Sequence, residues 1–241
     1  MRNYEQELKN RIQFIQNKLK EANASGIIFG NSGGKDSALV GILAKYACEN
    51  VLGVIMPCES KRNFEEDMED GLKLANQFNI ENITVNLTDT KKSIAKAIEN
   101  VENITSESSK NIAPRLRMTT LYAIGQSKNY LVAGTGNKSE LYMGYFTKWG
   151  DGAFDLNPIA DLTVTEIYEF LEFLEAPQNI IKKAPSAGLF EGQTDELELG
   201  ITYGEIDEYI ATGKGKAESV AIIERAHRVT EHKRRMPDMY E

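Results

Sequence analysis

Residues 25–37 read Ser-Gly-Ile-Ile-Phe-Gly-Asn-Ser-Gly-Gly-Lys-Asp-Ser, and this stretch decides the fold. Its first six residues form a short apolar run that ends in glycine, which predicts a buried strand over 25–30. A tight loop follows, and the Ala- and Leu-rich residues 36–48 predict a helix. A strand, a glycine-rich loop and a helix in this order place the loop at the carboxyl end of a strand, where ligands bind in open α/β sheets.

The same alternation of strand and helix continues along the chain. Apolar, β-branched runs predict three further strands, over residues 51–56, 83–87 and 130–133. Helical spacing of apolar residues predicts helices over residues 2–22, 65–78, 89–101, 116–126, 163–174, 203–211 and 217–229. Strands that alternate with helices indicate a parallel sheet covered on both faces. We therefore expect an α/β fold with a doubly wound parallel sheet, in a single domain over 1–241.

Three segments are mostly polar and are expected to be loops. Residues 102–112 are interpreted as a mobile loop, and residues 134–161, rich in Gly, Asp, Asn and Thr, as long shaped loops. Residues 184–200 contain Pro, Gly and acidic residues, which is typical of a lid over a binding site.

Composition and charge narrow the class of protein. The chain has 241 residues, a formal net charge of -8 and a sequence pI near 5.1. This charge argues against sequence-independent nucleic-acid binding, which needs a basic face. Cys48 and Cys58 lack C-x-x-C spacing, so we expect no disulfide framework or zinc site, and a reducing compartment. The N-terminus has no apolar signal region and no apolar run is long enough to cross a bilayer, so we expect a cytoplasmic protein without a membrane partner.

Residues 30–37 have the composition of an anion-binding loop. The paired glycines let backbone N–H groups close around a phosphate, and the start of the following helix adds partial positive charge. Ser32 and Ser37 add hydroxyl donors. A Walker A loop is excluded, because Phe29 and Asp36 stand where that motif needs Gly and Ser or Thr. A carboxylate beside a phosphate repels it unless a cation lies between them, so the expected role of Asp36 is to bind a bridging Mg²⁺.

This loop resembles the SGGxDS loop of the PP-loop ATP pyrophosphatases. Members of that superfamily cleave ATP between its α and β phosphates and adenylate a substrate. The resemblance implies a Rossmann-like sheet of the adenine nucleotide alpha hydrolase type, with ATP bound by residues 30–37. The alternative is a glycine-rich turn with a helix-capping Ser or Asp, which the preceding strand and the following helix disfavour.

Motifs along the rest of the chain look like those of the ammonia-dependent NAD synthetases. They occur in order over nearly the whole chain, at residues 111–122, 134–140, 144–152, 155–159, 185–189, 192–196, 198–201 and 232–234. The resemblance implies ATP-dependent amidation of deamido-NAD with ammonia, the last step of NAD biosynthesis, through an acyl adenylate. It also implies a homodimer with the dinucleotide near the interface. The chain leaves no region for the amidase domain of glutamine-using relatives, so free ammonia is the expected nitrogen donor.

Carried over position by position, the resemblance implies roles for individual residues. The ATP site would comprise Gly30, Asn31, Ser32, Gly33, Gly34, Lys35, Asp36, Ser37, Thr135 and Ser186. Ser32, Lys35 and Asp36 would be catalytic, and Asp36 and Glu140 would bind Mg²⁺. The deamido-NAD site would comprise Arg115, Lys148, Asp155, His232 and Lys233. These residue types suit the substrate, since Arg and Lys pair with its pyrophosphate and carboxylate, and a carboxylate accepts from ribose hydroxyls.

Plainer interpretations of some of these residues stay open. Glu140 could be a solvated helix residue, and Arg115 a surface cation beside a polar loop. His232 and Lys233 stand in a basic run that could be a solvated tail.

Two positions depart from the pattern of the family. Val164 stands where the family often has a lysine that reaches the ATP phosphates, and Gly188 where it tends to have an aspartate near the ammonia site. We expect Lys35, Lys182 or Lys183 to replace the missing cation in part.

Two other functions remain compatible with the loop. One is a different PP-loop reaction: tRNA thiolation, tRNA lysidine formation or GMP synthesis, of which the tRNA versions need a basic surface that the net charge opposes. The other is a nucleotide-binding homologue that has lost turnover, for which the two departures would be the cause.

Overall fold

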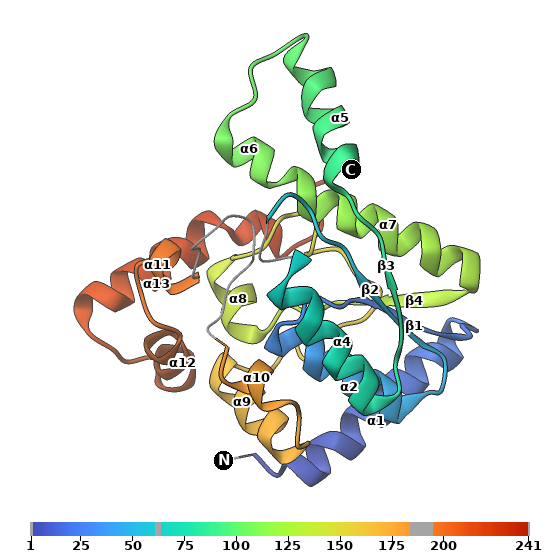
Figure 1. Cartoon of the computed structure of the whole chain (residues 1–241). Helices are drawn as coiled ribbons and strands as arrows, with labels where there is room; N and C mark the ends of the chain where they lie inside the picture. The colour runs from blue at the N-terminus through green and yellow to red at the C-terminus, as the bar shows by residue number, and fades with distance from the viewer. Residues whose placement is uncertain (1, 61–63, 184–194, 241) are drawn as a thin grey trace.

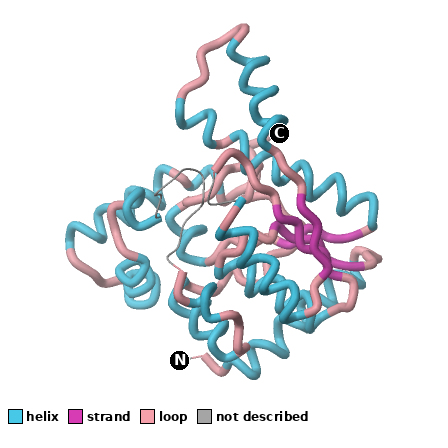
Figure 2. The backbone as a smooth tube through the Cα atoms, viewed as in Figure 1, coloured by secondary structure: helices cyan, strands magenta, loops and turns pink. Residues whose placement is uncertain are grey.

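The computed structural model describes residues 2–60, 64–183 and 195–240. Within them a four-stranded sheet forms in the order β3-β2-β1-β4, and every neighbouring pair of strands is parallel. The strands are β1 (Gly26–Gly30), β2 (Val51–Ile55), β3 (Glu81–Thr84) and β4 (Tyr130–Ala133). Figure 2 shows the strands gathered together with helices around them. The prediction of an α/β fold with a parallel sheet is confirmed.

The strand order creates a switch point between β1 and β4. The chain passes from β1 to β2 to β3 in one direction, then crosses back and pairs β4 with the free side of β1. Because such crossovers are right-handed, a reversal of direction moves the connecting helices to the opposite face of the sheet. Ligands of open α/β sheets bind at the carboxyl ends of the strands beside this point. The loops that follow β1 and β4 are therefore the candidate site.

Helices cover both faces of the sheet (Figure 1). One face carries α1 (Tyr4–Glu21), α2 (Lys35–Ala47) and α4 (Glu66–Phe78), with α9 (Val164–Phe173) and α10 (Gln178–Ile181) packed on α2. The other face carries α7 (Ile112–Lys128), from which α5 (Thr88–Glu99) and α6 (Ser106–Lys110) project. A further group lies beside the sheet: α8 (Lys138–Met143), α11 (Asp195–Leu199), α12 (Tyr203–Thr212), α13 (Ala217–Val229) and the 3-10 helix η1 (Glu231–Lys233).

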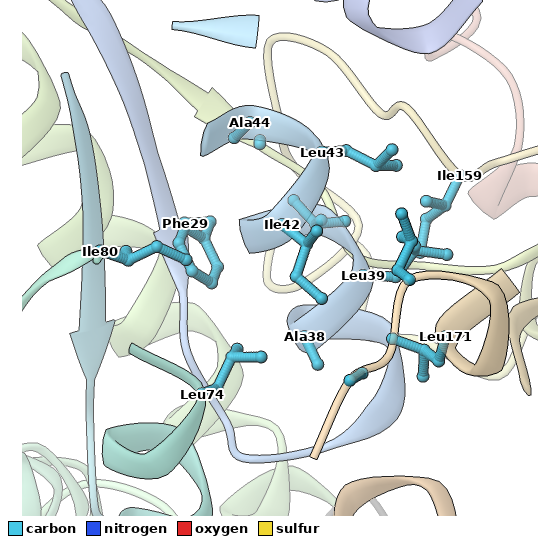
Figure 3. Close-up of a cluster of buried hydrophobic side chains, with 14 of the residues drawn as sticks. Phe29, Ala38, Leu39, Ile42, Leu43, Ala44, Leu74, Ile80, Ile159 and Leu171 are labelled. Carbon is cyan, nitrogen blue, oxygen red and sulfur yellow. The ribbon is translucent and has the colours of Figure 1, made fainter. Parts of the chain in front are cut away.

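Alternate residues of β1 enter two layers of the core. Ile27 and Phe29 pack in the layer that contains α2, whereas Ile28 packs with Leu121 of α7 on the opposite face. Figure 3 shows the first layer, with labels on Phe29, Ala38, Leu39, Ile42, Leu43, Ala44, Leu74, Ile80, Ile159 and Leu171. A Cβ atom on Gly41 would lie 2.6 Å from the ring of Phe29, so glycine lets α2 approach β1 closely. This packing holds the first turn of α2 at the end of β1.

The third strand lies earlier in the chain than the predicted 83–87. β3 ends at Thr84, although Val85 N still donates to Ile55 O and Leu87 N to Pro57 O. The regular ladder stops because β2 ends at Ile55 and Pro57 has no N–H to donate. The prediction of a third strand is therefore confirmed, and its bounds were wrong.

Two predicted loops contain helices. The prediction of a loop over 102–112 was wrong for α6, which Thr105 caps by accepting from Ser108 N, and α7 begins at Ile112 rather than at residue 116. Pro114 fits the first turn of α7, where backbone N–H groups have no helical partner. Within 134–161, α8 forms behind a capping box, in which Asn137 and Glu140 each accept from the other's backbone N–H.

No helix in the described part of the chain combines the length and the apolar character needed to span a membrane. Of the predicted lid over 184–200, residues 184–194 lie outside the described residues, and α11 occupies Asp195–Leu199.

Candidate active site

A cavity of about 440 Å³ opens at the switch point of the sheet. Its polar side is formed by the loop after β1 and the loop after β4, which bring together Ser32, Gly34, Lys35, Asp36, Ser37, Thr135, Gly136 and Glu140. Its apolar side is formed by Val54, Met56, Met118, Leu121 and Val132. An anion-binding loop beside an apolar slot suits a nucleotide, whose phosphates and base have these two characters.

Gly33 adopts a backbone conformation that requires glycine. Its φ is +70°, and a Cβ atom there would lie 2.1 Å from Asp67 O of α4. Asn31 is 1% exposed and fastens the same loop, because its Nδ2 donates to Gly71 O at 2.9 Å and to Asn82 Oδ1 at 3.1 Å. The predicted ATP residue Asn31 thus uses its side chain to hold the loop against α4 and β3.

The first turn of α2 is open toward the cavity. Gly34, the N-cap, has no side chain to cap the turn. Ser32 Oγ and Ser37 Oγ lie 3.0 Å apart, and Ser37 Oγ donates to Gly34 O at 3.0 Å. Backbone N–H groups and hydroxyls at a helix N-terminus can bind an anion. ATP binding by residues 30–37 stays a prediction.

Buried Lys35 and partly buried Asp36 form an ion pair beside this loop. Lys35 Nζ lies 2.7 Å from Asp36 Oδ2 and 5.6 Å from the centre of the Tyr203 ring. Asp36 Oδ1 accepts from Asn137 Nδ2 at 3.0 Å. Burial alone would lower the pKa of Lys35, but the charges of Asp36 and Glu140 raise it above its usual value. Lys35 therefore remains a fixed cation in the site.

Glu140 lies in the first turn of α8, and both Glu140 and Asp36 are hydrogen-bonded to Asn137. Glu140 Oε2 accepts from Asn137 N at 3.1 Å. Burial raises the pKa of Glu140 well above its usual value, and the charges of Asp36 and Asp195 raise it further, while Lys35 opposes them. The burial of its carboxylate disfavours the interpretation of Glu140 as a solvated helix residue. A cation between Asp36 and Glu140 would remove the repulsion between the two carboxylates.

These two carboxylates fit Mg²⁺ together with a bound nucleotide. The described residues contain no group of three or more His, Cys, Asp and Glu side chains that could hold a metal ion. Mg²⁺ in nucleotide enzymes binds to one or two carboxylates and completes its shell with phosphate oxygens and water. Asp36 and Glu140 would be the protein's ligands in such a shell, and their binding of Mg²⁺ stays a prediction.

Three of the predicted deamido-NAD residues lie next to one another. Arg115 donates to Lys148 O at 3.3 Å, and Lys148 Nζ donates to His232 O at 2.8 Å. Lys233 lines the cavity, and its Nζ donates to Gly144 O at 2.8 Å and to Phe146 O at 2.7 Å. The C-terminal segment is therefore packed on the 144–148 loop and is not a free basic tail.

Asp155 has structural partners of its own. Its Oδ2 accepts from Val132 N at 2.8 Å and its Oδ1 from Tyr122 OH at 3.1 Å. Arg115, Lys148, Asp155 and His232 do not belong to the lining of the cavity. The predicted set thus divides into one residue at the cavity wall and four outside it.

Val164 and the lysines predicted to replace its missing cation have different surroundings. Val164 is 4% exposed and packs with apolar residues of α8, α12 and α13. Lys183 lines the cavity and is held by Asp67 at 2.7 Å and Asp70 at 2.6 Å, whereas Lys182 is exposed and does not belong to the lining. Gly188 and the predicted ATP residue Ser186 lie outside the described residues.

The cavity also contains residues that sequence reasoning missed. Arg117 lines it and its Nε donates to Met56 O at 3.2 Å, and burial lowers the pKa of its guanidinium. Asp195 is 3% exposed and accepts from Tyr145 OH and Tyr203 OH. Arg117 stands two residues after Arg115 on the same helix, which was the available signal for it.

Comparisons with known proteins agree along the whole chain. The NAD synthase family model matches residues 7–237. An NH(3)-dependent NAD(+) synthetase of Carboxydothermus hydrogenoformans is 49% identical over 240 residues, 98% of this chain and 98% of that protein. An NMN synthetase structure from Francisella tularensis has a TM-score of 0.95 at 34% identity, covering 100% of this chain and 99% of its own. An NH3-dependent NAD synthetase structure from Campylobacter jejuni has a TM-score of 0.81 at 33% identity, covering 100% of both. The chain therefore belongs to the NAD synthase family.

Proposed function

We propose that this chain amidates deamido-NAD with ammonia at the expense of ATP, giving NAD, AMP and pyrophosphate. The observation that supports this proposal best is the uncapped N-terminus of α2, which lies in the cavity at the switch point of the sheet together with Asp36 and Glu140. Membership of the NAD synthase family supports the reaction, since the relative from Carboxydothermus hydrogenoformans is an NH(3)-dependent NAD(+) synthetase.

The loop residues would bind and orient ATP. Backbone N–H groups at the start of α2, with the hydroxyls of Ser32 and Ser37, would hold the phosphates, and Lys35 would stabilise the negative charge that develops on them. Thr135 lies on the opposite loop of the same cavity and would contact the nucleotide there. The apolar slot beside Met56 and Leu121 would take the adenine.

Asp36 and Glu140 are the proposed Mg²⁺ ligands. The bound ion would supply positive charge to the triphosphate and to the leaving pyrophosphate. Neither carboxylate needs to act as a proton donor or acceptor in this scheme.

The reaction has two steps. The nicotinate carboxylate attacks the α-phosphorus of ATP, which forms the acyl adenylate and releases pyrophosphate. Ammonia then attacks the acyl carbon and AMP leaves. An adenylate hydrolyses in water, so residues 184–200 are the proposed cover, of which Asp195 and Glu198 line the cavity.

The second substrate would lie across the cavity wall and the surface beyond it. Lys233 at the wall suits the nicotinate end, while Arg115 and Lys148 outside it suit the pyrophosphate and Asp155 a ribose. His232 joins this surface through its backbone. Since four of these residues lie outside the cavity, we propose a homodimer, in which a second copy covers the remainder of the dinucleotide.

A single assay tests the proposed function. Purified protein is incubated with ATP, deamido-NAD and ammonium, with Mg²⁺ or with EDTA, and NAD and AMP are measured. We expect equal amounts of NAD and AMP in the presence of Mg²⁺, and much less product with EDTA or with glutamine in place of ammonium. ATP binding without any product would favour the non-catalytic homologue and overturn the proposal.

A second substrate follows from the similarity to the Francisella tularensis protein. That structure is an NMN synthetase, and its TM-score of 0.95 covers essentially the whole of both chains. Amidation that yields NMN would start from nicotinate mononucleotide, which carries the same carboxylate. The ratio of kcat/KM for the two substrates decides between them, and we expect deamido-NAD to be preferred because Arg115 and Lys148 suit the longer molecule.

A further inference from the structure

Asp207 of α12 is a buried carboxylate that joins three helices. It is 8% exposed. Its Oδ1 accepts from Ser139 Oγ of α8 at 2.5 Å, and its Oδ2 accepts from Thr165 N of α9 at 2.8 Å and from Thr165 Oγ1 at 2.7 Å. Burying a charge in this way is costly unless its hydrogen bonds are satisfied, and here both oxygens are.

Ser139, the residue before Glu140, connects this carboxylate to α8. The Ser139 side chain is buried, donates to Asp207 and accepts from Val164 N at 3.3 Å. The orientation of the Ser139 hydroxyl is therefore fixed, because it donates to Asp207 and accepts from Val164 N. The first turn of α8 is held through Ser139 by α12 and α9, and through Asn137 by Asp36.

Asp207 accepts one backbone N–H of the first turn of α9, but this helix does not depend on Asp207 for its cap. Helix α9 has a capping box of its own, in which Thr163 Oγ1 accepts from Glu166 N and Glu166 accepts from Thr163 N. Helix α8 spans only six residues, which is too short to hold its shape without outside contacts. The contact that distinguishes Asp207 is therefore the one to α8.

We propose that Asp207 is a positioning residue that orients Glu140 toward Asp36 and the Mg²⁺–ATP complex. Asp207 touches neither nucleotide nor metal in this role. It fixes the turn that carries Glu140, so that the carboxylates of Glu140 and Asp36 would bind the same cation. The inference rests on the metal site of the proposed function and not on the identity of the amidated substrate.

The test is ATP binding by calorimetry, with excess Mg²⁺ and with EDTA, in Asp207→Asn. The variant would present an amide donor to Ser139, whose hydroxyl proton would then lose its acceptor. Residues behind a metal ligand commonly affect metal affinity by at least tenfold, so we expect ATP affinity to fall about tenfold with Mg²⁺ and less than about twofold with EDTA. An equal fall under both conditions, or no fall, would overturn the proposal.

Two further variants make the test specific. Ser139→Ala breaks the same link from its other end and should reproduce the Mg²⁺-dependent loss, which keeps the test decisive if Asp207→Asn does not fold. Thr163→Ala removes a cap of α9 without touching Ser139 or Asp207 and should leave both affinities unchanged. An Mg²⁺-dependent loss in Thr163→Ala would show that any damage to α9 suffices, against the proposal.

The outcome is separate from that of the amidation assay. Wild-type protein that binds Mg²⁺–ATP and shows the expected variant effects, but makes no NAD, would retain the positioning role and reject the proposed substrate. Full amidation activity, with variant effects on ATP affinity that do not depend on Mg²⁺, would retain the proposed substrate and reject the positioning role.

Discussion

Gly33 and Asp67 approach each other so closely that a Cβ atom on the glycine would lie 2.1 Å from the aspartate's carbonyl oxygen. The contact joins the loop after β1, the proposed site of the ATP phosphates, to the first turn of α4. Because a backbone carbonyl cannot rotate away as a side chain can, the loop itself would have to move to accommodate any other residue. The position is thus restricted twice, by this contact and by a φ of +70°.

Gly33→Ala is predicted to damage ATP binding. We expect at least about tenfold weaker ATP binding and a loss of about 1–3 kcal/mol of unfolding free energy, since a strained backbone conformation costs this much. Calorimetric titration with ATP and urea denaturation measure the two effects. Gly213→Ala is the matched control and should leave ATP binding unchanged, because φ is +67° there too, but no atom lies within 4 Å of its Cβ and it does not belong to the lining of the cavity. Equal effects in both variants would contradict the role given to Gly33.

Asp36→Asn and Glu140→Gln are predicted to abolish most of the activity. Each variant keeps the shape of the side chain and removes a charge from the proposed metal site, so we expect kcat to fall about a hundredfold or more at saturating substrates. ATP affinity should also become less sensitive to Mg²⁺. Glu172→Gln removes an exposed carboxylate of α9 and should leave kcat unchanged. Normal Mg²⁺-dependent turnover in Glu140→Gln would remove it from the metal site.

The fold could be predicted where local pattern and tertiary contacts agree. The short apolar run over residues 25–30 predicts a buried strand, and the composition of the residues after the glycine pair predicts a helix. Both elements are present in the structure. The bounds of β3 could not be predicted, because they depend on where its neighbour β2 ends. The short α6 was missed because its polar sequence lacks apolar periodicity and only the Thr105 cap marks its start.

The loop residues of the candidate site could be predicted from the sequence, but the long-range contacts that hold them in place could not. Residues 30–37 are contiguous, so motif and chemistry could be recognised together. The contact between Ser139 and Asp207 spans 68 positions, and no local pattern reveals it. The same holds for Lys183, whose partners Asp67 and Asp70 lie on another helix. Such contacts are set by how helices pack, which a single sequence does not specify.

Three variants test the prediction that another lysine replaces the cation that the family often has at the position of Val164. Lys35 and Lys183 line the cavity, whereas Lys182 does not. A charged hydrogen bond to phosphate contributes about 1.5–3 kcal/mol, so we expect Lys35→Ala and Lys183→Ala each to weaken ATP binding about tenfold. Lys182→Ala is the matched control and should leave ATP binding unchanged. If neither of the first two variants changes ATP affinity, no lysine of this set takes over the role.

Ion pairs of Arg2, which stands just before helix α1, hold the N-terminal segment on the rest of the protein and predict a pH dependence of stability. Arg2 Nε donates to Glu166 Oε1 at 2.7 Å and Arg2 Nη1 to Asp161 Oδ2 at 2.8 Å. Burial alone would raise the pKa of both carboxyl groups, but hydrogen bonds and nearby charges outweigh it. Those of Arg11 and Arg2 lower the pKa of Asp161, and those of Arg2, with a hydrogen bond from Thr163 N, lower the pKa of Glu166. A lowered pKa in the folded state means that the stabilisation is present above the ordinary values of 3.8 and 4.5 and is lost as pH falls through the folded values.

Arg2→Met should therefore cost stability at neutral pH and progressively less in acid. Both carboxyl groups are partly exposed, so we expect the variant to lose only about 1 kcal/mol of unfolding free energy at neutral pH. This difference from the wild type should shrink below about pH 4, because the carboxylates that Arg2 stabilises become protonated in the unfolded and then in the folded state. Urea denaturation of both proteins from neutral pH to about pH 3 measures it. Lys9→Met removes an exposed pair with Glu5 on the same helix and should change stability by less than about 0.5 kcal/mol throughout. A difference for Arg2→Met that stays constant or grows in acid would mean that lost packing, and not the ion pairs, accounts for its effect.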